Sequence, residues 1–70
     1  MRYYAVESRN LASIAYSPDL LQLYVRFHTR REYMYDHVPA DVYARLMNAK
    51  SVGEYFSQHI RDVYAATEIK

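Results

Sequence analysis

The sequence contains no cysteine and no tryptophan, and it has one glycine and two prolines among its 70 residues. The absence of cysteine excludes the disulfide framework of small secreted domains and the cysteine-based zinc sites, so we expect a cytoplasmic protein. With Gly53 as its single glycine, the chain cannot form a glycine-rich loop of the kind that binds phosphates. No apolar run approaches the ~18 residues that a membrane-spanning helix needs, and we expect no membrane partner.

A chain of this length forms a single domain, which spans residues 1–70. Domains of this size bury only about 60% of the surface that their unfolded chain exposes. A cofactor cavity would compete with such a shallow core, so we expect no cofactor. The aromatic content is dominated by nine tyrosines, and six of them lie on apolar stripes where we expect packing: Tyr16, Tyr33, Tyr35, Tyr43, Tyr55 and Tyr64.

No arrangement of residues points to catalysis or to a metal site. The histidines, His28, His37 and His59, lack the close spacing of zinc ligands. There is no cysteine and no G-x-S-x-G motif, and no serine has a base that the sequence identifies. We therefore predict no catalytic residue and no metal, and we expect the protein not to be an enzyme.

Hydrophobic periodicity predicts the fold class. Alternation with a period of two dominates up to Val38, and a period of 3.6 follows Pro39. This order predicts an α+β fold, with a three- or four-stranded antiparallel meander followed by two C-terminal helices packed on one face. The clearest strand covers residues 21–28, in which Leu21, Leu23, Val25 and Phe27 form the apolar face.

The neighbouring strands are shorter. We expect one around Ile14 and Tyr16, joined to the clearest strand by a turn at residues 17–19, and another over residues 32–36. A bend is expected at residues 8–11, and residues 3–7 are a candidate edge strand. A three-residue loop over residues 29–31 would place Phe27 opposite Tyr33 and Val25 opposite Tyr35, with both tyrosines on the apolar face, whereas a four-residue loop would place Met34 there. We favour the three-residue loop because it pairs aromatic and β-branched partners, and pairs His28 with Glu32.

The helices follow from their start signals. Pro39 suits the first turn of a helix that runs to about Ala49. Ser51 and Glu54 form a capping box at the start of a second helix, whose apolar stripe continues to Val63 and Tyr64. The tail over residues 65–70 either continues this helix or frays.

Gly53 lies in the first turn of the second helix, where glycine costs about 1 kcal/mol relative to alanine. One interpretation is close packing of the helix backbone against a neighbouring element. The other is an anion bound by the free backbone donors of the helix N-terminus.

The outer face of the sheet is the candidate ligand-binding surface. It would present Tyr24, Arg26 and His28 to solvent, beside Arg30 and Arg31 in the hairpin loop. An aromatic ring flanked by guanidinium groups on an open sheet is typical of RNA-binding modules. The hypothesis that we prefer is a protein partner or self-association, since open sheet faces and strand edges also invite protein contacts. Nucleic acid is the alternative partner.

A set of residues in order along the chain carries a resemblance to a known family: Ser8, Asn10, Leu11, Ile14–Tyr16, Leu23, Val25, Phe27, Tyr33–Tyr35, Val38–Pro39, Val42–Tyr43, Leu46, Ala49, Ser51–Phe56, Ile60–Arg61 and Tyr64. This set resembles the KTSC domain over residues 6–64. The family is a short module found alone in bacterial and phage proteins and at the C-terminus of some lysyl-tRNA synthetases. Its function is not established, although that association has suggested RNA binding.

The resemblance implies which residues carry the family motif. The Y-x-Y tyrosines correspond to Tyr33 and Tyr35, the S-x-G helix start to Ser51 and Gly53, and the closing arginine to Arg61. Two departures stand out. Residues 29–31 replace the loop glycine that usually precedes Y-x-Y, and Ser57 replaces the asparagine that usually follows the aromatic pair.

Overall fold

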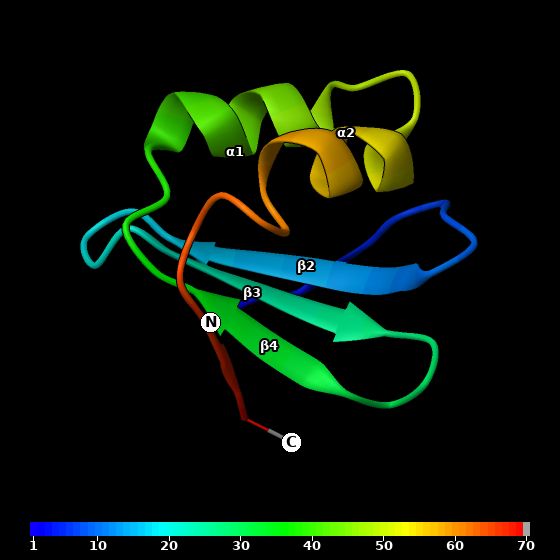
Figure 1. Ribbon diagram of the computed structural model, residues 1–70, viewed down its shortest axis with the longest axis horizontal. Helices are drawn as coiled ribbons and strands as arrows, with labels where there is room; N and C mark the ends of the chain where they lie inside the picture. Colours follow the sequence, from blue (N-terminus) through cyan, green and yellow to red (C-terminus); the bar gives the residue numbers. More distant parts are fainter. Residues whose placement is uncertain (70) are drawn as a thin grey trace.

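A computed structural model of the chain describes residues 1–69. Five antiparallel strands form one sheet in the order β1-β2-β3-β4-β5, and both helices lie over one of its faces (Figure 1). The elements are β1 Tyr4–Ala5, β2 Leu11–Ser17, β3 Gln22–Phe27, β4 Glu32–Tyr35, α1 Ala40–Met47, α2 Val52–His59 and β5 Ala66–Glu68. The predicted α+β class and antiparallel sheet are confirmed, but the predicted number of strands is wrong.

The unexpected strand is β5, which follows the helices and returns to the sheet beside β4. Tyr33 pairs with Glu68 and Tyr35 pairs with Ala66, so the tail neither continues the second helix nor frays over these residues. All three residues of β5 are exposed. They therefore lack the alternation of apolar and polar side chains by which a half-buried strand is recognised.

Strand β2 begins at Leu11 and is longer than predicted, because a β-bulge extends its inward face. The register shifts between Leu11 and Ser13, so that one extra residue of β2 faces β3. Leu11 and Ile14 are both buried as a result, although they are three positions apart. At the other end of β2, Leu21 lies in the turn with a positive φ of 55°, and its predicted place on the inward face of the strand is wrong.

The hairpin between β3 and β4 keeps a three-residue loop, but at residues 28–30. Val25 pairs with Tyr33, and Arg26 pairs with Glu32. The backbone N–H of Phe27 donates to the carbonyl of Arg31 over 2.9 Å. The predicted partners were therefore two positions off in register, and the pairing of His28 with Glu32 was wrong. The inward orientation of the tyrosines is confirmed, because a shift of two preserves the face.

The helix starts were predicted more accurately than the helix ends. Pro39 is the N-cap of α1. The Ser51 hydroxyl caps α2 by accepting a hydrogen bond of 3.3 Å from the Glu54 backbone N–H. Helix α2 ends at His59, and Val63, predicted to lie on the apolar stripe, is 63% exposed.

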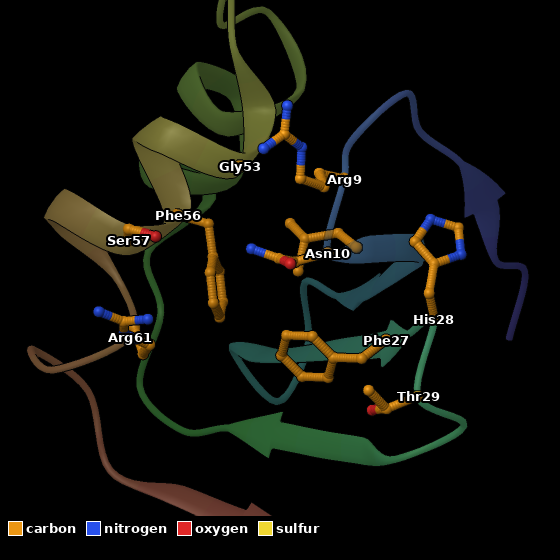
Figure 2. Close-up of a pocket in the computed structure, with 10 residues that line it drawn as sticks. Arg9, Asn10, Phe27, His28, Thr29, Gly53, Phe56, Ser57 and Arg61 are labelled. Carbon is orange, nitrogen blue, oxygen red and sulfur yellow. The ribbon is translucent and has the colours of Figure 1, made fainter.

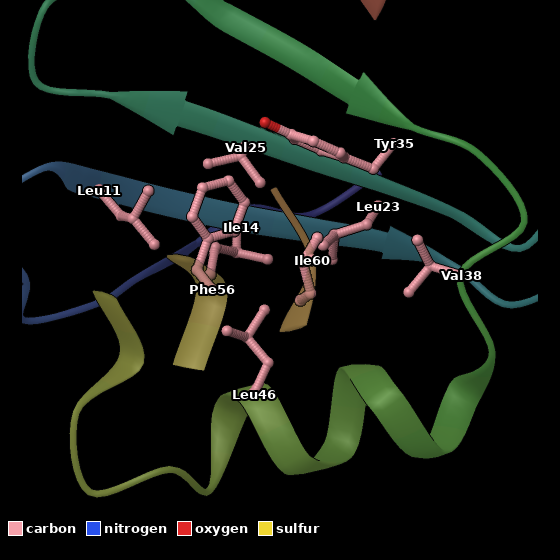
Figure 3. Close-up of a cluster of buried hydrophobic side chains, with 9 residues drawn as sticks. All are labelled: Leu11, Ile14, Leu23, Val25, Tyr35, Val38, Leu46, Phe56 and Ile60. Carbon is pink, nitrogen blue, oxygen red and sulfur yellow. The ribbon is translucent and has the colours of Figure 1, made fainter. Parts of the chain in front are cut away.

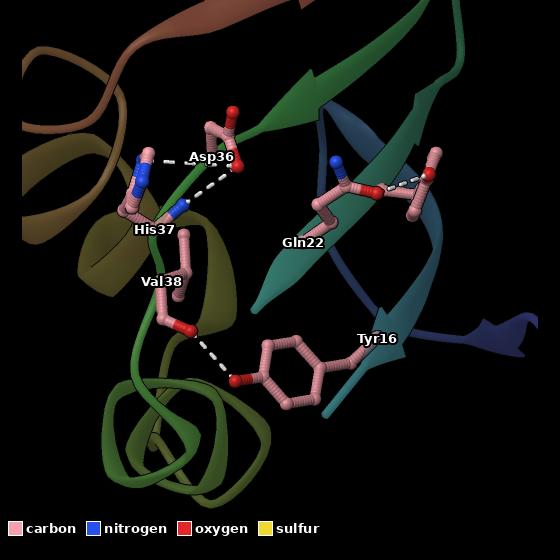
Figure 4. A network of polar contacts seen from close by, with 6 residues as sticks. Tyr16, Gln22, Asp36, His37 and Val38 are labelled. Carbon is pink, nitrogen blue, oxygen red and sulfur yellow. Dashed lines mark hydrogen bonds and ion pairs between the residues drawn. The ribbon is translucent and has the colours of Figure 1, made fainter. Parts of the chain in front are cut away.

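The core lies between the helices and the sheet (Figure 3). Its buried members are Leu11, Ile14, Leu23, Val25, Tyr35, Val38, Leu46, Phe56 and Ile60. One end of this core is closed by tyrosine. Tyr16 stacks on Tyr43 of α1, with ring centroids 4.6 Å apart, and its hydroxyl donates to the Val38 carbonyl over 2.6 Å (Figure 4).

Candidate binding site

Charged side chains on the outer face of the sheet pair with other groups of the protein. Arg26 Nε donates to Glu32 Oε1 over 2.9 Å, and the Tyr3 hydroxyl donates to the same oxygen over 3.3 Å. The Arg26 guanidinium also lies over the Tyr3 ring, 3.6 Å from its centroid. In this Tyr3–Arg26–Glu32 cluster, the hydrogen bond to Glu32 raises the pKa of Arg26. Burial, followed by the charge of Glu32, raises the pKa of Tyr3. Arg26 is thus already bound by groups of the protein.

The other residues of the predicted ligand-binding surface are divided between two places. Tyr24 remains on the outer face, where its hydroxyl donates to Gln22 over 2.8 Å. Arg30 and Arg31 lie at the end of the β3–β4 hairpin, and Arg31 Nε is 3.9 Å from a carboxylate oxygen of Glu68. His28 belongs to the hairpin loop, with Nε2 3.1 Å from the Ser8 carbonyl oxygen. The structure therefore does not bring the five predicted residues together on one face.

A cleft opens at the hairpin end of the core, between the sheet and α2 (Figure 2). We call it the end cleft. It has a volume of about 240 Å³ and is lined by Arg9, Asn10, Leu11, Phe27, His28, Thr29, Gly53, Phe56, Ser57 and Arg61. Its floor is apolar, because it is formed by the partly buried Phe27 and by Leu11 and Phe56, which are almost fully buried beneath it. Phe27 and Phe56 meet edge to face, with ring centroids 5.8 Å apart.

The rim of the end cleft is cationic and polar. Among residues 1–69, the side chains of Arg9, Asn10, Thr29 and Ser57 have no hydrogen-bond or ion-pair partner. Arg61 has only an exposed neighbour, Asp62, with Nε and Oδ2 3.8 Å apart, and such pairs are worth little. The lining contains no carboxylate. Carboxylates appear beyond Arg9, in an adjacent hollow that includes Glu7 and Glu54. The end cleft thus offers positive charge and free polar groups, in contrast to the outer face.

Gly53 lies where α2 approaches the loop between β1 and β2. The Ser8 hydroxyl oxygen accepts hydrogen bonds of 3.3 Å from the backbone N–H groups of Asn10 and Leu11. A Cβ atom at Gly53 would lie 2.8 Å from this oxygen, closer than side chains normally pack. This geometry agrees with the close-packing interpretation of Gly53, and the same approach forms one side of the end cleft.

The residues of the family motif surround or support the end cleft. Tyr33 packs edge to face on Phe27, with ring centroids 5.7 Å apart, and Tyr35 packs edge to face on Phe56 at 5.4 Å. Tyr35 is 4% exposed, and burial raises the pKa of its hydroxyl. The Y-x-Y tyrosines therefore pack against the two phenylalanine rings that line the cleft. Ser51 caps α2, while Gly53 and Arg61 line the cleft directly.

The end cleft was not predicted, because four separate segments contribute to it and no local pattern joins them. Arg9, Asn10, Thr29 and Ser57 were not proposed as site residues. A signal did exist in the resemblance, since Asn10, Leu11, Phe27, Gly53, Phe56 and Arg61 all belong to the residues that carry it and all line the cleft.

Over residues 1–69, no group of three or more histidine, aspartate or glutamate side chains is placed to hold a metal ion. No helix in the same range is long and apolar enough to cross a membrane.

Comparison with known proteins identifies the family. The KTSC domain matches residues 7–64, and the chain belongs to this family. A KTSC domain protein from Yersinia pestis, known from its crystal structure, has a TM-score of 0.95 and 29% identity, covering 99% of this chain and 97% of that one. A protein from Stutzerimonas stutzeri (strain A1501), described as uncharacterized, is 36% identical over 58 residues, which are 83% of this chain and 82% of that protein. Neither description states an activity.

Proposed function

We propose that this chain is a non-catalytic binding module for single-stranded nucleic acid, which it holds at the hairpin end of the sheet. The observation that carries the proposal is the composition of the end cleft. Arg9, Arg61 and His28 surround an aromatic floor, and no carboxylate lines it. Proteins that bind single strands combine a positive groove for the backbone with aromatic rings for the bases.

This proposal moves the site away from the outer face of the sheet. Arg26, which the sequence placed on the candidate ligand-binding surface, contacts Glu32 and Tyr3 instead. Arg30 lines a separate hollow with Arg26 and Glu32, and Arg31 lies 3.9 Å from Glu68, so these two arginines add positive charge to the hairpin outside the cleft itself. Glu7 and Glu54, on the other side of Arg9, would repel a polyanion. The bound nucleic acid is therefore expected to leave the cleft toward the β3–β4 hairpin.

The absence of catalysis remains part of the proposal. His28 is the histidine in the lining of the end cleft, and its Nε2 faces a backbone carbonyl 3.1 Å away. General-base activation of a nucleophile needs a base within hydrogen-bond reach of a hydroxyl or thiol. The contact of His28 with a backbone carbonyl supports a role in holding the loops together.

Fluorescence anisotropy with a labelled single-stranded RNA at two salt concentrations tests the proposal. The variant with both Arg9→Gln and Arg61→Gln should bind more weakly, and its salt dependence should be shallower by about 1.4 in log–log slope, at about 0.7 per lost phosphate contact. The control is Arg45→Gln, since Arg45 lies on α1 beside Asp41. Absence of binding by the native chain at low salt, or equal behaviour of the double variant and the control, would contradict the proposal.

A second candidate function, contact with a protein partner or a second copy, has support at the opposite end of the sheet. Met1 and Leu20 are 71% and 63% exposed, and both line a shallow hollow with Pro18 and Tyr24. Exposed apolar groups that cluster in this way mark contact surfaces. Light scattering tests self-association: the mass should rise above 8.4 kDa with concentration, and Leu20→Ser should reduce the rise. A constant monomer mass would contradict it.

A further inference from the structure

We infer that the end cleft accepts one unpaired nucleobase, stacked on Phe27 and hydrogen-bonded by the side-chain amide of Asn10. This inference rests on the proposed function and specifies it further, because it assigns base recognition, and not only phosphate binding, to the cleft. Size, stacking surface, hydrogen-bonding groups and charge each support it.

The size of the cleft suits one flat group of a longer ligand. Its volume of about 240 Å³ is below the roughly 300–1,000 Å³ of pockets that enclose whole small molecules. It corresponds to about eight water molecules at ~30 Å³ each. A ligand that used this cleft would therefore insert one part and leave the remainder outside.

Phe27 supplies a stacking surface whose orientation is fixed. Its ring meets Tyr33 at an interplanar angle of 87° and Phe56 at 68°, so two neighbouring rings support it edge to face. Phe27 is itself only partly buried. Recognition of single-stranded RNA uses partly exposed aromatic rings of this kind, on which an unstacked base is placed.

Asn10 supplies the hydrogen-bonding groups. Its backbone N–H donates to the Ser8 hydroxyl oxygen over 3.3 Å, and its carbonyl accepts from the His28 backbone N–H over 3.0 Å. The backbone is thus held on both sides, while the side-chain amide has no partner among the described residues. Asn10, Phe27 and Phe56 line the same cleft, and in the view of Figure 2 the amide is drawn between the α2 side of the cleft and the hairpin side. An amide presents an adjacent donor and acceptor, which match the paired donor and acceptor on base edges.

The charged groups fit the phosphates that flank the inserted base. Arg9 and Arg61 both line the cleft, and Figure 2 places them on different sides of the Asn10 amide. A phosphate or carboxylate bound alone would engage the arginines and leave the apolar surface of Phe27 uncovered. A base with its phosphate covers both, and for this reason we favour a nucleic acid over an acidic peptide.

The test compares two labelled oligomers of equal length and charge: a single-stranded RNA, and the same ribose–phosphate chain without bases. Stacking of one base predicts that the native chain binds the RNA about tenfold more tightly. Asn10→Ala and Phe27→Leu should each reduce this ratio and leave the salt dependence unchanged. Gln58→Ala, which alters an exposed amide of α2 outside the cleft, is the matched control. In nuclear magnetic resonance spectra, the side-chain amide signal of Asn10 should shift with the RNA and not with the base-free chain.

The outcomes separate the two proposals. If neither oligomer binds, the proposed function itself fails. If both bind equally, and Asn10→Ala behaves like Gln58→Ala, nucleic-acid binding stands and the base site is overturned. Competition by a peptide with an acidic C-terminus that displaces the RNA and shifts the Asn10 amide would also overturn it. Because the Asn10 side chain is exposed, Asn10→Ala is expected to fold even where Phe27→Leu does not.

Discussion

The Tyr16 hydroxyl donates a hydrogen bond of 2.6 Å to the carbonyl oxygen of Val38, joining β2 to the segment between β4 and α1. The backbone N–H of Val38 donates in turn to the Leu21 carbonyl over 2.8 Å. Val38 is fully buried. This end of the core is therefore closed by hydrogen bonds and by the stacked ring of Tyr43, while the hairpin end remains open as the end cleft.

Tyr16→Phe should lower the stability of the fold. The substitution keeps the ring stack and removes the donor to Val38, which costs about 1 kcal/mol. For a domain of this size we expect the melting temperature to fall by about 4–8 °C. Thermal unfolding followed by circular dichroism measures the change. Tyr43→Phe is the control, since the Tyr43 hydroxyl has no hydrogen-bond partner within residues 1–69, and equal melting temperatures for the two variants would contradict the assignment.

Gly53→Ala should destabilise the native chain but not a chain that lacks the Ser8 hydroxyl. The added Cβ would meet the Ser8 oxygen at 2.8 Å, which outweighs the gain of up to ~1 kcal/mol that alanine brings to a helix. In a Ser8→Ala background this oxygen is absent, and Gly53→Ala should become neutral or stabilising. Urea unfolding of the native protein, the two single variants and the double variant gives the coupling energy between the two sites. Additive effects would show that Ser8 is not the reason for the glycine.

Alkaline pH should destabilise the protein through three tyrosines that are wholly or partly buried. Burial raises the pKa values of Tyr16, Tyr35 and Tyr43 above the ordinary value of about 10. The folded state then binds more protons than the unfolded state in this range. Stability is fully present below pH ~10 and is lost as the pH rises through the raised values. Urea unfolding at pH 8, 10 and 11 measures the decline, which should be smaller in Tyr35→Phe. A stability that is constant over this range would refute the prediction.

Removal of residues 66–70 should expose the edge of β4. Tyr33 and Tyr35 pair with Glu68 and Ala66 in the native sheet, and unpaired strand edges promote association between chains. We expect lower stability together with dimers or larger species in light scattering. A full-length chain with Thr67→Ala, which leaves the backbone pairing intact, is the comparison. A truncated chain that stays monomeric and equally stable would show that β5 does not protect this edge.

Local signals in the sequence were sufficient for most of the fold. The alternation around Leu23 and Val25 identified the central strand, and Ser51 marked the start of α2 through its side-chain cap. The hairpin register was wrong by two positions because alternation has a period of two, so both registers place Tyr33 and Tyr35 on the same face. The loop backbone selects between them, and Arg30 adopts its left-handed position with φ of 72°. No side-chain pattern specifies that.

The candidate binding site was harder to predict than the fold. Arg26 and Tyr24 were chosen because alternation places them on the solvent side of β3, which is correct. The partners of Arg26 are the non-local Tyr3 and Glu32, and no spacing rule connects residues 3, 26 and 32. Asn10 and Arg61 are likewise brought to one cleft only by the packing of α2 on the sheet. Periodicity predicts which side chains are buried and which face of an element they occupy. Contacts between polar groups that are distant in the sequence depend on the complete tertiary structure.

Arg30 adopts a left-handed backbone conformation, and under the proposed function a substitution at this residue should change stability and affinity for nucleic acid in opposite directions. Glycine adopts such a conformation without the cost of roughly 1–2 kcal/mol that other residues incur. Arg30→Gly should therefore raise the free energy of unfolding of the domain and lower its affinity for a polyanion. Under the proposed function, Arg30 keeps a positive charge at the hairpin tip at a cost in conformational stability, which is a common trade-off at residues used for binding.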